Sequence, residues 1–422
     1  MHKGSITLGR CTLLALTLCA FEAQAQEEAD ESQVVRIYGF IDSYFEKVAQ
    51  TPASIDANGD TVYEDNPYEF DVPNLHLMVQ GVIGGKYRYF LNLAAPGSGG
   101  IGGDEGLAVR NAWVEAPIAG NALQVRWGKT YRRFGLYNEI LDAVPTFIGI
   151  EAPELLDKDH LIVTRTTNLM VHGSIPFGDN AVQYALMTGN DERTDGAFPL
   201  GGDLRFKIGS GIQFGTSVYS SGGKASPTRG VGDGSPRGGV LNWMTEDEYL
   251  VFGGYAELKQ DGLILQAAFW QASHEGTRDP SSVLSLIDAG LNERQLARFG
   301  LNGPNPTEAD VVTEANYDII TYYVRAGYAM ETSVGEFTPY LQWDHYENPE
   351  TIASKSFGGD GEAGLTDDGA FDKATIGTIW RPISPVALKL DGSAHIQDFN
   401  GKQEIYPEVR LSFSYFWQLE EL

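Results

Sequence analysis

Cysteine is almost absent from this chain. Its two cysteines, Cys11 and Cys19, both lie within the first 25 residues. A disulfide framework is therefore excluded from the rest of the chain, and so is a catalytic or metal site built on cysteine.

Long apolar runs are equally scarce. The run at 11–21 is too short to cross a bilayer as a helix, and no later stretch reaches the ~20 apolar residues that a spanning helix needs. This run follows a basic segment at 1–10 and ends at Ala23-Gln24-Ala25, the small-x-small pattern of a cleavage site. We therefore predict that residues 1–25 are a secretory signal peptide and that the mature chain begins at Gln26.

Positive charge is also in short supply. The chain has 30 Lys and Arg against 57 Asp and Glu, a formal net charge of -27, which disfavours nucleic acid as a partner because phosphates need a basic surface. The seven histidines are scattered, and neither His-Glu-x-x-His nor Gly-x-Ser-x-Gly occurs. The sequence predicts no metal, no cofactor and no enzymatic activity.

Glycine and aromatic residues are abundant, with 50 Gly, 20 Tyr, 20 Phe and 7 Trp. After an acidic lead-in at 26–34, predicted to be disordered, apolar and polar residues alternate with a period of two. In the first such segment Ile37 and Ile41 share one face, while Tyr38 and Asp42 share the other. A membrane β-barrel alternates in this way, so its mean hydropathy, here -0.22, stays near that of a soluble protein.

The alternation predicts an all-β fold, a transmembrane antiparallel β-barrel over 35–417 followed by a tail at 418–422. Short connections would lie on the periplasmic side and long loops on the extracellular side. A β-sandwich or propeller is the rival fold, but several segments reach the ~9 to 11 residues of a tilted membrane strand. About sixteen strands are expected: 36–45, 74–83, 87–93, 107–116, 122–129, 161–175, 181–189, 203–209, 212–220, 249–259, 263–272, 317–330, 336–346, 371–381, 386–397 and 405–417.

Two of the long connections have unusual patterns. Residues 281–300 carry apolar side chains at helical spacing, which predicts helix. Residues 131–156 are apolar for an exposed loop, so they need a surface to pack on. Folding into the lumen as a constriction is one interpretation, and a cap or a subunit contact is the other.

Basic residues outnumber acidic ones on the predicted lumen wall. They would favour anions if they form a charged constriction, or they would simply pair with carboxylates across neighbouring strands. Lys129, Arg132 and Arg133 stand at the root of the apolar loop, where they could meet an anion or anchor the loop to 151–159. The predicted lining residues are Arg36, Arg88, Arg110, Arg126, Lys129, Arg132, Arg133, Arg205, Lys207, Arg325, Lys373, Lys389 and Arg410.

Asp56, Asn58 and Asp60 place oxygen ligands at alternate positions, as a calcium loop does. The motif lacks the closing Glu of the full twelve-residue pattern. An acidic, solvated turn is the alternative interpretation, and it is the one we favour.

One region resembles a known family. The strand Arg110-Asn111-Ala112-Trp113, a short turn, and a strand ending in Gly128, Phe134 and Gly135 are similar to the phosphate-selective porin O and P family. The resemblance is specific over about 110–135. It implies a trimeric porin of the Gram-negative outer membrane, passing small hydrophilic or anionic solutes along a passage lined by Arg and Lys. The alternatives are an outer-membrane enzyme and an adhesion or structural barrel with a plugged lumen.

Overall fold

The computed structural model describes most of the chain after residue 34. The predicted signal peptide and lead-in lie outside the described residues, as do 420–422 of the predicted tail. The described residues are 35–95, 108–140, 144–150, 152–153, 165–189, 198–221, 241–354 and 360–419.

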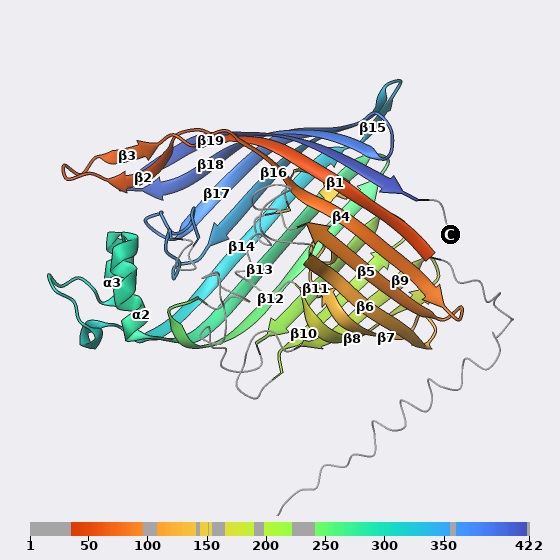
Figure 1. The fold of residues 1–422 in the computed structure, drawn as a ribbon, viewed down its shortest axis with the longest axis horizontal. Coiled ribbons are helices and arrows are strands. Elements are labelled where there is room, and N and C mark those ends of the chain that lie inside the picture. The colour runs from red at the N-terminus through yellow and green to blue at the C-terminus, as the bar shows by residue number, and fades with distance from the viewer. Residues whose placement is uncertain are drawn as a thin grey trace, which may run out of the picture.

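Sixteen antiparallel strands form a closed barrel in this part of the chain (Figure 1). Each strand pairs with its neighbours in sequence, and β1 closes the barrel by pairing with both β4 and β19. The short β15 (Met330–Thr332) continues β14 along the same partner, β16. The strands are β1 (Val35–Val48), β4 (Glu69–Ile83), β5 (Tyr87–Ala95), β6 (Ala108–Ala119), β7 (Leu123–Tyr131), β8 (Arg165–Phe177), β9 (Asn180–Gly189), β10 (Leu200–Ile208), β11 (Ile212–Ser220), β12 (Met244–Gln260), β13 (Leu263–Arg278), β14 (Glu314–Tyr328), β16 (Gly335–Glu347), β17 (Ala370–Arg381), β18 (Val386–Phe399) and β19 (Lys402–Gln418).

Alternation along each strand separates an apolar exterior from an interior of polar and aromatic side chains. On β10, Asp203 faces the lumen and is 4% exposed, whereas its neighbour Leu204 faces outward and is 39% exposed. Outward-facing Leu341 and Ile376 are more exposed still. Exposed large apolar side chains recur on nearly every strand, which is the surface that a transmembrane barrel presents to lipid.

No helix in the described residues is both long enough and apolar enough to cross a membrane.

The predicted barrel is confirmed, with each predicted strand overlapping an observed one. The prediction missed the hairpin of β2 (Thr51–Ile55) and β3 (Thr61–Glu64), which projects from the end of the barrel that carries α2 and α3 (Figure 1). Asp56 closes this hairpin, because its carboxylate accepts the backbone N–H groups of Asn58 at 2.8 Å and Asp60 at 2.9 Å. These bonds are those of a polar turn, and the described residues contain no group of three or more His, Cys, Asp or Glu placed to hold a metal.

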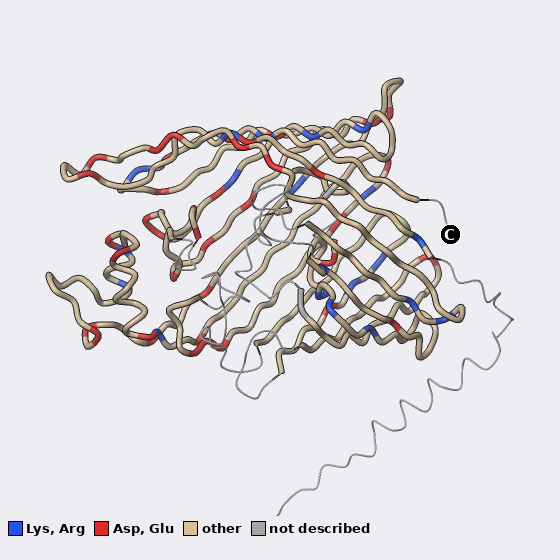
Figure 2. The backbone as a smooth tube through the Cα atoms, viewed as in Figure 1, with Lys and Arg blue, Asp and Glu red and all other residues tan. Residues whose placement is uncertain are grey.

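The two ends of the barrel differ. Connections at one end are short, such as 84–86 and 261–262, and we call this the turn end. The other is the loop end, where Figure 2 shows Asp and Glu gathered on the loops. There the β13–β14 connection contains α2 (Pro280–Ser285), η5 (Leu286–Ala289), α3 (Glu293–Phe299) and η6 (Glu308–Asp310), which confirms the predicted helix.

Local caps set the limits of these helices. Asp279 caps α2 by accepting the N–H of Ser282 at 2.9 Å, and Asn292 and Gln295 form a capping box on α3. Phe299 of α3 belongs to the same buried cluster as Tyr317 of β14. The helical connection therefore packs against side chains that face the barrel interior.

Candidate channel lining

A loop that follows β7 crosses the barrel interior. We call its described residues, 132–140, 144–150 and 152–153, the inner loop; they include η2 (Asn138–Ile140) and η3 (Val144–Thr146). The Gly135 N–H donates to Ser217 Oγ of β11 at 3.0 Å, and the Ile150 N–H donates to Asp391 Oδ2 of β18 at 3.0 Å. Because β11 and β18 lie far apart around the barrel, the inner loop spans the lumen, as the constriction interpretation predicts.

Aromatic contacts hold the first part of the inner loop against the wall. The Phe134 ring lies 4.4 Å from Trp270 of β13, and Tyr137 meets Tyr323 of β14 edge-on at 6.0 Å. Gly135 lies between them with φ +62°, and a Cβ there would come within 2.9 Å of the Trp270 ring. This backbone conformation and this close approach both require glycine.

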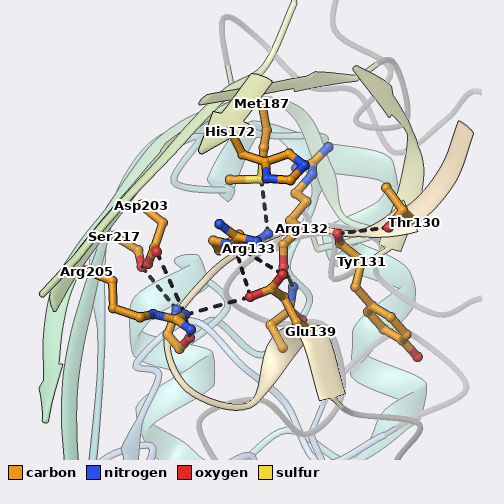
Figure 3. Close-up of polar contacts among 12 residues, drawn as sticks. Thr130, Tyr131, Arg132, Arg133, Glu139, His172, Met187, Asp203, Arg205 and Ser217 are labelled. Atoms are coloured by element: carbon orange, nitrogen blue, oxygen red, sulfur yellow. Dashed lines mark hydrogen bonds and ion pairs between the residues drawn. The ribbon is translucent and has the colours of Figure 1, made fainter. Parts of the chain in front are cut away.

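An acidic residue inside the inner loop binds two of the predicted basic residues (Figure 3). Arg133 Nε lies 3.1 Å from both carboxylate oxygens of Glu139, and Arg205 of β10 lies 3.7 Å from the same carboxylate. Arg205 also donates to the Gly135 carbonyl at 3.0 Å. Arg133 is thus paired within its own loop; of the acidic segment predicted as its anchor, 151–159, only Ala152 and Pro153 are described.

The surrounding guanidinium groups keep Glu139 ionised. Its burial would raise the pKa, but Arg133, Arg205 and Arg126 together outweigh this effect and hold the pKa below the usual range of a glutamate.

Arg132, which precedes Arg133, is buried and lies over the Tyr219 ring of β11 at 4.5 Å. The root of the inner loop is therefore tied to β10 and β11.

A second cluster surrounds Glu115 of β6. Arg88 of β5 donates to this carboxylate, as does Arg126 of β7 at 2.8 Å, and His172 of β8 lies 2.8 Å from it. Arg126 also lies over the Trp113 ring at 4.1 Å. The sequence prediction missed Glu115, although this residue shares the inward alternation of Asn111 and Trp113.

Two more of the predicted basic residues contact the inner loop, one near each end of it. Lys389 of β18 is fully buried and donates to the Gly149 carbonyl at 2.9 Å. Arg325 of β14 donates to the Tyr137 hydroxyl. Both predicted lining residues therefore position the inner loop.

Nearer the loop end, the other predicted basic residues of β17 and β19 are paired. Arg410 lies 2.7 Å from Glu46 and 2.7 Å from Glu408, and Lys373 lies 3.5 Å from Glu408. These contacts fit the interpretation in which lumen charges pair across strands.

The remaining predicted residues occupy diverse positions. Lys207 of β10 is two residues after Arg205, so it lies on the same lumen-facing side of the strand, and it is partly buried. Arg36 is exposed near the start of β1. Arg110 stands at a β-bulge, where strand alternation no longer sets its direction. Lys129 is exposed and shares the alternation of outward-facing Trp127, so the structure does not place it with Arg126.

Between the inner loop and the opposite wall lies a cavity of about 670 Å³, which we call the lumen chamber. Its lining is mainly apolar and aromatic, and no sequence pattern marked it because it joins distant segments. The loop contributes Glu139, Ile140, Pro145 and Thr146, and the barrel contributes Tyr38, Phe40, Met78, Phe90, Asn92, Asn111, Tyr131, Arg381, Ser384, Pro385, Ala387 and Phe416.

No family model and no curated protein matches this chain. The resemblance to the phosphate-selective porin O and P family therefore stays a prediction.

Solved structures do match. An anion-selective porin from Comamonas acidovorans has a TM-score of 0.55 at 13% identity, covering 92% of this chain and 100% of that chain. The outer membrane channel DcaP of Acinetobacter baumannii has a TM-score of 0.51 at 12% identity, covering 93% and 99%. OmpT, an outer membrane protein of Vibrio cholerae in its trimer form, has a TM-score of 0.51 at 9% identity, covering 92% and 100%. At these identities the likeness establishes the porin-like barrel fold.

Proposed function

We propose that this protein is an outer-membrane porin through which small hydrophilic solutes diffuse passively. The observation that carries the proposal is a closed barrel with an apolar exterior and a cavity between its inner loop and the opposite wall. A barrel of sixteen strands leaves room for an aqueous passage. This function needs neither a cofactor nor a chemical step.

We further propose a preference for anions. Basic side chains near the root of the inner loop outnumber the carboxylates Glu115, Glu139, Asp203 and Glu257 there. A positive excess at a narrowing attracts anions more strongly than it would in open water. The basic residues are Arg88, Arg126, Arg133, Arg205 and Lys207.

A matched pair of lysine variants tests both proposals in planar bilayers. We expect stable conductance and an anion-favouring reversal potential across a salt gradient for the parent chain. Lys207→Ala removes an inward-facing charge and should weaken the preference, while outward-facing Lys129→Ala should leave it unchanged. No conductance would refute the porin; a cation preference, or equal effects of the two variants, would refute the basic-lining argument.

We propose that the chain assembles as a homotrimer, since OmpT, a structural neighbour, is described in a trimer form. The contact between subunits would use outward-facing side chains, because the inward-facing ones line the lumen. Sedimentation of the detergent-solubilised protein at matched detergent density measures the assembly directly. A monomer mass across the accessible concentration range would contradict this proposal.

A further inference from the structure

The lumen chamber has an unexpected lining for a passage of water and ions. Tyr38 of β1, Phe90 of β5 and Phe416 of β19 line it from the wall, and each is only partly buried. Ile140 lines it from the inner loop and is 41% exposed. Apolar surface left uncovered inside a folded protein commonly marks a place where a ligand binds.

The charged groups of the chamber already have protein partners. Glu139 is paired with Arg133 at 3.1 Å. Arg381 of β17 lies 3.1 Å from Glu336 and donates to the Pro145 carbonyl at 3.2 Å. A charged solute entering the chamber would have to compete with these contacts, so the lining favours an uncharged one.

The other polar groups are neutral. The Asn92 and Asn111 amides and the Thr146 and Ser384 hydroxyls lie among the aromatic side chains. A solute with one flat apolar ring and a few hydroxyl groups could therefore stack on the rings and form hydrogen bonds beside them. A volume of about 670 Å³ is in the range of pockets for compounds of moderate size.

We propose that the lumen chamber is a binding site for uncharged solutes that carry an aromatic ring. This inference rests on the proposed channel function and names one class of solute that the channel would recognise. The rings of Tyr38, Phe90 and Phe416 stack on the solute, and Ile140 covers it from the side of the inner loop. The ring thereby gains contacts that a small polar solute cannot make.

Current interruption by two matched glucosides tests this proposal on the full chain in planar bilayers. Phenyl β-glucoside and methyl β-glucoside carry the same sugar and no charge, and they differ by the aromatic ring. We expect only the phenyl compound to cause resolved interruptions of the ionic current. Equal interruption by both would overturn the proposal, because the site would then recognise the sugar.

Two phenylalanines of the same strand provide the control. Phe416 lines the chamber, whereas Phe413 faces outward and is 43% exposed. Removing one stacked ring should shorten the interruptions by about tenfold, so we expect this for Phe416→Ala and no change for Phe413→Ala. If Phe416→Ala fails to insert, Phe90→Ala on β5 of the same wall decides, with the same expected shortening.

The outcomes separate the two proposals. A parent chain without conductance refutes the channel itself. Stable conductance without interruptions by phenyl β-glucoside refutes only the aromatic site. Equal shortening by Phe413→Ala and Phe416→Ala also refutes it, because the ring that matters would then lie outside the chamber.

Discussion

Glu139→Gln should shift the ion selectivity of the channel toward anions. Glu139 lies in the inner loop and lines the lumen chamber. We take about 7 Å as the separation between a passing ion and its carboxylate. The substitution keeps the shape of the side chain and removes its charge. It removes the carboxylate that Arg133 and Arg205 share, while Arg205 keeps Asp203 at 3.8 Å.

The size of the shift follows from Coulomb's law. One charge at about 7 Å contributes ~0.6 to 1.2 kcal/mol for an effective dielectric constant between about 80 and 40. Salt at about 0.1 M, with a screening length near 10 Å, leaves roughly half of this energy. Anions and cations feel it with opposite sign, so the anion-to-cation permeability ratio should rise roughly threefold to eightfold.

Reversal potentials across a salt gradient measure this ratio for the parent and the variant. Glu248→Gln is the matched control, since Glu248 of β12 is exposed on the outer face of the barrel and the change removes the same charge. An unchanged ratio for Glu139→Gln, or an equal shift for Glu248→Gln, would refute the reasoning.

Three other predictions concern the inner loop and the exterior. The pKa of Glu139 is depressed, so its ion pairs are complete above the ordinary value of about 4.3 and are lost as pH falls through the lower folded value. Below that pH the parent should acquire the selectivity of Glu139→Gln. If Glu139→Gln shows the same change of selectivity with pH as the parent, the titrating group is not Glu139. Lys389→Met removes the donor to the Gly149 carbonyl at a cost of ~1 to 3 kcal/mol, so open-channel current noise should rise, whereas unchanged noise would mean that this bond does not hold the loop. Leu341→Arg places a charge on the outward face, where Leu341 is 58% exposed, and should lower the unfolding free energy in lipid vesicles by about 2 to 4 kcal/mol; a urea midpoint equal to that of the parent would contradict a lipid-facing position.

Much of the barrel could be predicted because the two-residue period is a local property of the chain. Asp203, Leu204 and Arg205 alternate in sequence and also alternate between lumen and exterior. The same local logic located the helices at 281–300. The β2–β3 hairpin escaped because its short strands are exposed, so they carry no alternation imposed by burial.

The prediction of the lining failed at two positions for different reasons. Arg110 stands at a bulge that shifts the register between β5 and β6. A bulge leaves no mark in the hydrophobic pattern, so strand alternation is unreliable on either side of it. Lys129 was predicted at the root of the loop, but it lies within β7, where regular alternation places its side chain on the outer face with that of Trp127.

The candidate site depends on contacts between distant parts of the chain. Ile150 bonds to Asp391 across a separation of 241 residues, and Tyr137 bonds to Gln266 across 129. The apolar character of 131–156 indicated that this loop needs a surface to cover it. It did not indicate which wall it contacts or which residues remain to line the chamber on the other side.

In the proposed channel, ions pass through the lumen chamber between the inner loop and the opposite wall. Both cysteines of the chain precede residue 26. A thiol introduced in the barrel can therefore be identified by comparing its labelling with that of the parent. Thr146→Cys places a thiol on an exposed inner-loop residue that lines the chamber, and outward-facing Leu411→Cys is the control. A bulky thiol reagent should lower the single-channel conductance of Thr146→Cys and leave that of Leu411→Cys and the parent unchanged. Conductance that is unaffected at Thr146→Cys after verified labelling would contradict this passage.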